Sequence, residues 1–167
     1  MVAPVTAGIA AMDENRFMER AATLALQKMR ANEGGPFGAL IVRDGDVVAE
    51  GWNQVTSAND PTGHAEIVAI RNACASLKTF SLDGCDIYTN CEPCPMCLGA
   101  IYWAHIRRIY YSNTRADAAR IGFDDDFIYR EINIPLDRRR IPAVRIVNQA
   151  SELAFSEWAK SPDKQRY

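Results

Sequence analysis

A chain of 167 residues, 48% hydrophobic and 24% charged, has the length of one domain and enough apolar residues for a buried core. Its formal net charge of −2 lacks the basic excess with which proteins neutralise phosphates, which argues against a nucleic-acid partner. No apolar run approaches the roughly 20 residues that cross a membrane, and no basic segment precedes an apolar stretch at the N-terminus. Five cysteines, an odd number, suit a reducing compartment. We therefore expect a cytoplasmic protein without membrane contact.

The first half of the chain reads as one helix followed by a β-hairpin. Residues 1–12 show no clear hydrophobic period, and we expect a flexible segment there. From 13 to 30 apolar residues recur every three or four positions, which predicts a helix. The GGPFG stretch at 34–38 ends it, and residues 39–49 hold two apolar segments around a tight turn, as in a hairpin. Asn53 follows the second strand, where either a ligand-binding group or a turn residue is expected.

The second half alternates between strand and helix patterns. The expected elements are a helix whose first turn carries His64 and Glu66, a strand at 86–89, a helix from Pro95, a strand at 107–111, a broken helical stretch at 115–131, a strand at 143–147 and a last helix from Ser151. This alternation predicts an α/β domain with helices on both sides of a sheet. We assign residues 13–160 to that domain and 161–167 to a C-terminal tail.

Two short motifs carry residues that bind metals. His-Ala-Glu at 64–66 and Cys-Glu-Pro-Cys-Pro-Met-Cys at 91–97 offer one imidazole and closely spaced thiols. His64, Cys94 and Cys97 make three ligands for zinc, and catalytic zinc keeps its fourth position for water or substrate. Glu66 is placed to face that fourth position without ligating the ion. Both cysteines lie at an expected helix N-terminus, which favours the thiolate form that metals bind.

Cys91 opens two other interpretations of the second motif. With Cys94 and Cys97 it forms a Cys-x-x-Cys-x-x-Cys run that is typical of iron–sulfur proteins. That site needs a fourth cysteine a few residues later, and none follows Cys97. A closed structural zinc site with Cys91 as fourth ligand stays open, and it would leave Glu66 without a role.

The order His-x-Glu and then Pro-Cys-x-x-Cys resembles the signature of zinc-dependent nucleobase deaminases. Segments 34–38, 59–62, 91–103 and 122–129 are similar, more closely, to the compact bacterial guanine deaminases. This resemblance implies a cytidine deaminase-like fold, a three-layer α/β/α sandwich with a five-stranded mixed sheet. It also implies one Zn²⁺ per subunit and hydrolytic deamination of guanine to xanthine and ammonia.

The same resemblance assigns roles to further residues. Glu66 would be catalytic, and Asp125 would recognise the guanine edge and share in proton transfer. The resemblance places these residues around the purine base: Phe37, Asn53, Ala65, Pro93, Trp103, Asp125 and Tyr167. In that family the C-terminal segment is exchanged between subunits, which implies a homodimer in which Tyr167 closes the partner's site.

Three other functions remain as alternatives. A guanosine or other nucleoside deaminase would need room for a ribose, and a tRNA adenosine deaminase would need a basic surface. A zinc-stabilised binding module without activity would not depend on Glu66. Four residues depart from the pattern of the guanine deaminases beside the site: Trp52, Gly63, Asn90 and His105.

Overall fold

The computed structural model describes the backbone of residues 5–165 and the side chains of residues 14–165. The chain divides into two compact units, Met1–Asp126 and Phe127–Tyr167. Within the part described, no helix is both long and apolar enough to cross a membrane.

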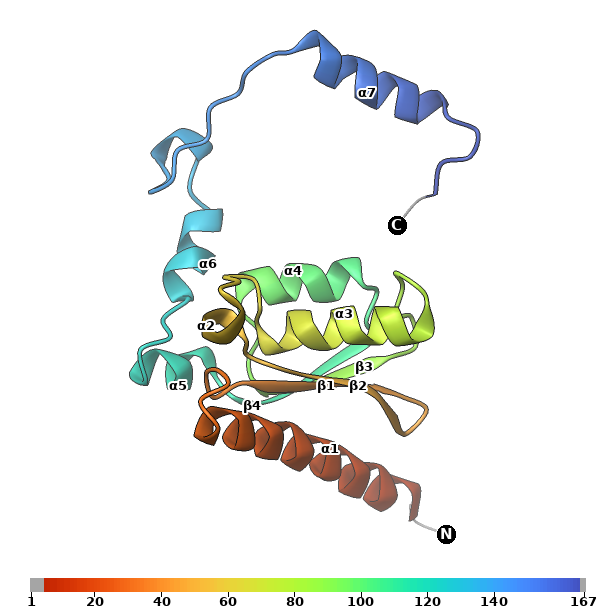
Figure 1. Cartoon of the computed structure of the whole chain (residues 1–167), viewed down its shortest axis with the longest axis vertical. Helices are drawn as coiled ribbons and strands as arrows, with labels where there is room; N and C mark the ends of the chain where they lie inside the picture. The colour runs from red at the N-terminus through yellow and green to blue at the C-terminus, as the bar shows by residue number, and fades with distance from the viewer. Residues whose placement is uncertain (1–4, 166–167) are drawn as a thin grey trace. The chain divides into compact units, whose positions relative to one another are not determined.

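The first unit is built on a mixed four-stranded sheet in the order β2-β1-β3-β4 (Figure 1). β1 pairs antiparallel with both β2 and β3, and β3 pairs parallel with β4. The two central strands are the most buried, because helices cover them on both faces. The strands run over Gly38–Arg43 (β1), Asp46–Trp52 (β2), Asp86–Cys91 (β3) and Arg108–Asn113 (β4).

Helices cover both faces of this sheet, which confirms the predicted α/β/α layers. α1 (Val5–Arg30) lies on one face, and α3 (Ala65–Leu77) and α4 (Pro95–Trp103) lie on the other (Figure 1). Alternate residues of β1 supply the two cores: Leu40 packs with Phe17 of α1, whereas Ile41 packs with Ala69 of α3. Two short helices complete the unit, α2 (Val55–Ala58), which was not predicted, and α5 (Arg115–Arg120).

Gly51 sets the distance between β2 and α3. A Cβ atom added there would lie 2.3 Å from the carbonyl oxygen of Ala65 and 2.4 Å from the amide nitrogen of Ala69. Only a residue without a side chain lets the first turns of α3 rest directly on the strand. This contact fixes the end of the helix from which His64 and Glu66 emerge.

We therefore expect Gly51→Ala to lower the free energy of unfolding by about 1–3 kcal/mol, because the added methyl group meets backbone atoms that cannot rotate away. Urea denaturation of both proteins measures the difference. Gly99→Ala is the matched control, since no atom lies within 4 Å of its added Cβ, and alanine favours the helix in which it sits. A Gly51→Ala protein as stable as the control would contradict this account of the packing.

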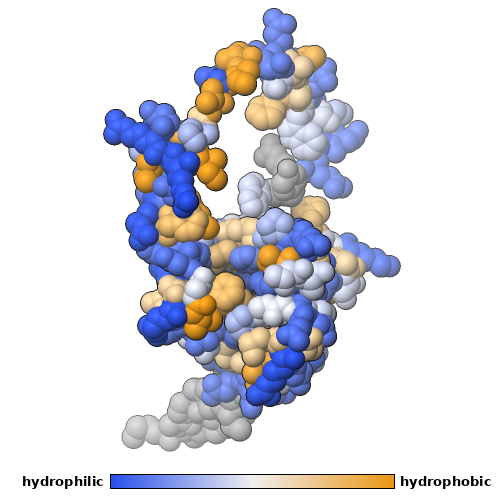
Figure 2. All heavy atoms as spheres, turned by 60° about the vertical axis from the view of Figure 1, so that its left-hand side comes forward, coloured by the Kyte–Doolittle hydropathy of each residue, from blue (hydrophilic) through white to orange (hydrophobic). Residues whose placement is uncertain are grey.

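The second unit holds α6 (Asp126–Ile132), the 3₁₀ turn η1 (Leu136–Arg138) and α7 (Gln149–Lys160). The last helix begins before the predicted Ser151, because the Asn148 side chain accepts a hydrogen bond from the Ser151 amide and caps the helix there. Hydrophobic side chains lie on the surface of this unit (Figure 2).

The fifth strand, expected at 143–147, does not form among the described residues, so the sheet has four strands. Val144 and Ile146 are 83% and 84% exposed. The segment has the composition of a strand, but a strand also requires a neighbour that pairs with its backbone, and none pairs with it here.

Candidate active site

Three metal-binding side chains meet where two helices begin. His64 is the N-terminal cap of α3, Cys94 is the cap of α4, and Cys97 lies in the first turn of α4. α3 and α4 lie side by side on the same face of the sheet (Figure 1). The Nδ1 atom of His64 is 3.6 Å from the Sγ atom of Cys94 and 3.5 Å from the Sγ atom of Cys97.

The geometry of this cluster fits zinc. Its three ligand atoms lie within 4.8 Å of one another. Tetrahedral zinc, with Zn–S bonds of about 2.3 Å and Zn–N bonds of about 2.0–2.1 Å, separates neighbouring nitrogen and sulfur ligands by about 3.6 Å. The measured separations match that value. Of the side chains that the structure describes, His64, Cys94 and Cys97 form the one such cluster of His, Cys, Asp or Glu groups.

Cys91 does not belong to the cluster. It is buried, and its Sγ atom lies 3.8 Å from the carbonyl oxygen of Thr114. Burial raises the pKa of Cys91 to about 11, which keeps it a thiol at neutral pH. The site therefore offers three ligands rather than four, as catalytic zinc sites do.

The two ligand thiols share hydrogen bonds that a metal ion would replace. The hydrogen bond from Cys97, with a second from His64, lowers the pKa of Cys94 to about 4. As the donor of that bond, Cys97 has its pKa raised. Binding of a metal cation favours the thiolate form of both cysteines and releases protons.

Glu66 lies beside the ligands without joining them. It occupies the first turn of α3, two residues after His64, and is only 6% exposed. Burial is the main reason that its pKa is raised to about 7. A carboxyl group with a pKa near the working pH can both take up and return a proton, so Glu66 is suited to general acid–base chemistry.

Hydrogen bonds connect Asn53 to the short loop that carries Phe37. The Oδ1 atom of Asn53 accepts hydrogen bonds from the backbone amides of Gly35 and Val55, both at 3.3 Å. The backbone amide of Asn53 donates to the carbonyl of Phe37 at 3.0 Å. Since its oxygen is occupied, the buried Asn53 side chain can offer a ligand the N–H groups of its Nδ2 atom.

Asp125 lies in the loop before α6, and this loop contacts the one that carries Phe37. The ring of Phe123 meets that of Phe37 edge-on, with centroids 4.9 Å apart. The Oδ1 atom of Asp125 is buried and has no hydrogen-bond partner among the described residues. Burial raises the pKa of Asp125, and the nearby Cys94 acts in the same direction. A buried carboxylate oxygen without a partner is costly unless a ligand satisfies it.

The remaining residues of the predicted site differ in their burial and in their distance from the metal ligands. Ala65 and Pro93 are buried, each next to a metal ligand. Trp103 lies at the far end of α4, about 14 Å from Cys94 along the helix axis, and is 65% exposed. The structure therefore does not bring Trp103 to the metal ligands. Tyr167 lies outside the described residues.

Two residues near the ligands make contacts that were not predicted, although Asn90 was noted as a departure from the guanine deaminase pattern beside the site. Glu92 accepts a hydrogen bond from the backbone amide of Arg115 at 3.0 Å and pairs with its guanidinium group at 3.2 Å. Asn90 bonds to the loop that carries Phe37. These partners are distant in sequence, so no local pattern indicated them; only the position of both residues beside the cysteine motif could have done so.

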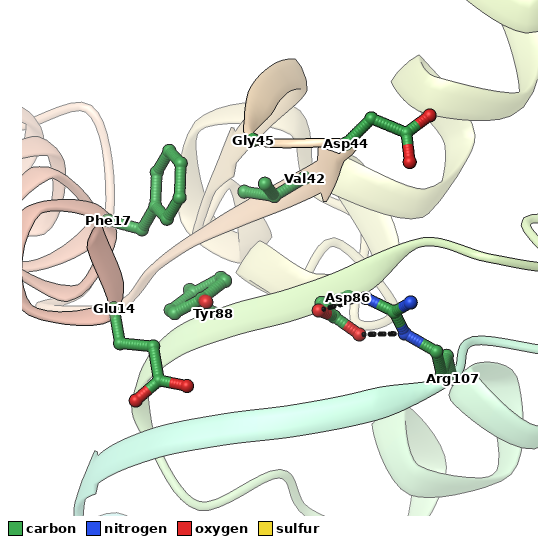
Figure 3. A pocket seen from close by; sticks show the side chains of 8 residues that line it. All are labelled: Glu14, Phe17, Val42, Asp44, Gly45, Asp86, Tyr88 and Arg107. Atoms are coloured by element: carbon green, nitrogen blue, oxygen red, sulfur yellow. Dashed lines mark hydrogen bonds and ion pairs between the residues drawn. The ribbon is translucent and has the colours of Figure 1, made fainter. Parts of the chain in front are cut away.

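A separate pocket lies on the opposite face of the sheet, between α1, the β1–β2 turn and β3 (Figure 3). Arg107 lines this pocket and donates two hydrogen bonds to the Asp86 carboxylate, from Nε at 3.0 Å and from Nη2 at 2.8 Å. Of the predicted active-site residues that the structure describes, none lines this pocket.

Comparison with known proteins agrees with the geometry. Residues 12–113 match the family described as the cytidine and deoxycytidylate deaminase zinc-binding region. The guanine deaminase of Bacillus subtilis (strain 168) is 49% identical over 156 residues, which cover 93% of this chain and 100% of that protein. The X-ray structure of guanine deaminase from Bacillus subtilis superposes with a TM-score of 0.89 at 50% identity, over 92% of this chain and 98% of that one.

A second kind of relative matches over a shorter stretch. The tRNA-specific adenosine deaminase of Agrobacterium fabrum is 44% identical over 99 residues, which cover 59% of this chain and 64% of that protein. The matched region, residues 12–113, contains both zinc motifs of this chain. The chain belongs to the family of the cytidine and deoxycytidylate deaminase zinc-binding region.

Proposed function

We propose that this protein is a zinc-dependent guanine deaminase, which converts guanine and water to xanthine and ammonia. The observation that carries the reaction class is the three-ligand cluster of His64, Cys94 and Cys97 beside the buried carboxyl of Glu66. The guanine deaminase of Bacillus subtilis, which aligns over 93% of the chain, supports guanine as the substrate.

Glu66 moves the protons of this reaction. Zinc, when bound, supplies the Lewis acidity that lets water ionise near pH 7. Glu66 takes one proton from that water and delivers it to a ring nitrogen of the base, while the oxygen bonds to the carbon that carries the amine. Glu66 then takes the second proton of the same oxygen and delivers it to the departing amine, so that ammonia leaves and the new carbonyl forms. Its raised pKa suits both directions of transfer, and its burial keeps bulk water from competing.

Asn53 and Asp125 provide opposite hydrogen-bonding groups for the base. Guanine carries a carbonyl oxygen at C6, a ring N–H at N1 and a second ring N–H in its imidazole ring. The free N–H groups of Asn53 suit the carbonyl, and the buried oxygen of Asp125 suits an N–H group. Phe37 supplies an aromatic surface for the ring. An analogue lacking one of these groups would leave a buried polar atom unpaired, which is how such sites select their substrates.

Product analysis tests this proposal. Purified, zinc-loaded protein is incubated with guanine, and xanthine and ammonia are quantified in the same samples. We expect the two products to form in equal amounts. Guanine left unchanged under these conditions would refute the proposed activity.

Adenosine deamination in tRNA is the second candidate, because the tRNA-specific adenosine deaminase of Agrobacterium fabrum is 44% identical over 99 residues. It ranks lower because that match covers 59% of the chain and because the net charge is −2. Inosine formed in a folded tRNA transcript, without xanthine formed from guanine, would favour it.

We infer that the protein is a homodimer whose C-terminal segments are exchanged, so that each tail closes the partner's site. Exposed apolar side chains in the second unit support this, among them Val144, Ile146 and Phe155, each more than 80% exposed. β4 is an edge strand, and edge strands pair readily with an added segment. Residues 143–147 have the composition for such pairing.

Removal of residues 164–167 is expected to lower kcat/KM for guanine by about 10²-fold, because an open site positions the base less well and admits water. Zinc content stays unchanged, since no ligand is removed. Steady-state ammonia release and metal analysis on the same preparation measure both quantities.

Co-expression with a Glu66→Gln chain separates exchange from closure within one subunit. A mixed dimer contains a truncated chain with an intact Glu66 and a full-length chain with an intact tail. If tails are exchanged, that dimer regains one complete site and activity returns. Activity no higher than that of the truncated protein would contradict exchange, and a truncated protein with normal activity would contradict closure by the tail.

A further inference from the structure

We propose that Asn90 is a positioning residue that holds the Phe37 loop against the strand leading to the metal ligands. The inference rests on the proposed function only in that Phe37 contacts the purine base. Asn90 is buried in β3, immediately before Cys91.

The side-chain amide of Asn90 forms hydrogen bonds with the backbone on both sides of Phe37. Its Oδ1 atom accepts a hydrogen bond from the amide of Gly38 at 2.9 Å, and its Nδ2 atom donates to the carbonyl of Pro36 at 2.9 Å. The carbonyl of Phe37 itself accepts from the backbone amide of Asn53 at 3.0 Å. Three consecutive residues of the loop are thus fixed by hydrogen bonds.

The position of Asn90 in the sheet explains why a side chain is needed. The antiparallel ladder between β1 and β3 ends at the pair of Ala39 and Thr89. One further step in this register brings Gly38 opposite Asn90. Where the backbone pairing stops, the side-chain amide of Asn90 makes the next two hydrogen bonds. These bonds attach the loop to the sheet.

The backbone of Asn90 connects these hydrogen bonds to the loop that carries the metal-binding cysteines. Its carbonyl accepts a hydrogen bond from the Asn113 side chain at 2.9 Å. The Asn113 carbonyl in turn accepts from the amide of Glu92 at 2.8 Å. Glu92 lies two residues before Cys94, so one short network spans the distance from the loop of Phe37 to the beginning of the metal site.

The arrangement requires both halves of an amide. One donor and one acceptor must lie side by side on a short, buried side chain, and asparagine provides this pair. Aspartate has the same shape, but when ionised it offers acceptors only, so it would face the Pro36 carbonyl without a proton to donate. Alanine would leave the Gly38 amide and the Pro36 carbonyl unpaired.

Asn90→Asp therefore raises KM for guanine by about 10-fold, the equivalent of one buried hydrogen bond at about 1.4 kcal/mol, while kcat changes less than KM. An increase in KM with little change in kcat is the signature of lost substrate binding. Zinc per subunit stays at the wild-type value. Asn90→Ser, whose single hydroxyl can make one of the two hydrogen bonds, shows a smaller increase and serves as the test if Asn90→Asp does not fold.

Asn72→Asp is the matched control. The Asn72 amide also donates to a backbone carbonyl, that of Glu50 at 2.8 Å, but it is exposed on α3 and lies outside the proposed site. Its KM should equal that of the wild type. An Asn90→Asp enzyme with unchanged KM and only a reduced active fraction would overturn the positioning role in favour of a purely structural one.

Hydrogen exchange at the Gly38 amide provides a readout that does not depend on the substrate. We expect protection in the wild type and in Asn72→Asp, and at least about 10-fold faster exchange in Asn90→Ala, which removes the acceptor of the Gly38 amide. Equal protection of the Gly38 amide in all three proteins would contradict the proposal that Asn90 positions the loop. A wild type that is inactive on guanine, together with faster Gly38 exchange in Asn90→Ala, would contradict the proposed function alone.

Discussion

Glu66→Gln lowers the turnover of guanine by about 10²- to 10⁴-fold, the range that general acid–base groups contribute. Glutamine keeps the size and hydrogen-bonding capacity of the side chain but cannot exchange a proton with water, base or amine. The buried position of Glu66 leaves no room for bulk water to replace it as the base. Stopped assays of ammonia release, extended to high enzyme concentration, measure the residual rate.

Zinc content and thermal unfolding should match the wild type, because Glu66 does not belong to the ligand cluster. Glu50→Gln is the matched control, since that carboxylate lies on β2 and pairs with Arg20 near the surface. A Glu66→Gln protein with normal turnover would favour a zinc-stabilised binding module or another catalytic base.

The second large effect is a loss of bound zinc, which we expect for one cysteine substitution and not for another. Cys97→Ala is expected to reduce bound zinc from about one ion per subunit to nearly none, and activity with it, because two remaining ligands hold zinc too weakly. Cys91→Ala should keep its zinc, since the Cys91 thiol faces the Thr114 carbonyl instead of His64. Elemental analysis of proteins purified side by side gives both values.

These two variants decide among the three interpretations of the cysteine motif. A closed four-ligand zinc site predicts that Cys91→Ala also loses metal, and an iron–sulfur site predicts iron and sulfide in the wild type. Either finding would contradict the three-ligand site.

The zinc site was predictable because its signals are local. His64 with Glu66, and Cys94 with Cys97, are close neighbours in sequence, and each pair sits where a helix begins. The order of strands and helices then required only that the two helices share one face of the sheet. The structure brings the three ligands together as predicted.

The missed features depend on contacts between distant residues. Asn90 bonds to groups 52 and 54 positions away, and nothing in its local sequence reveals that the ladder stops one residue short of it. Residues 143–147 resemble a strand locally, but strand formation depends on a partner that the described chain does not supply. The assignment of Trp103 to the purine base, made by resemblance, stays a prediction: the structure shows only that the length of α4 separates Trp103 from the metal ligands.

The measurement that tests the account most directly is kcat/KM for ammonia release from guanine, guanosine, adenine, cytosine and cytidine, each offered separately to zinc-loaded protein at neutral pH. We expect guanine to exceed every other substrate by orders of magnitude, because the proposed roles of Asn53 and Asp125 suit its polar groups and the proposed closing tail would exclude ribose. Guanosine or cytosine turned over as fast as guanine would leave the zinc site and Glu66 in their roles, but would contradict the assigned substrate and the closed site.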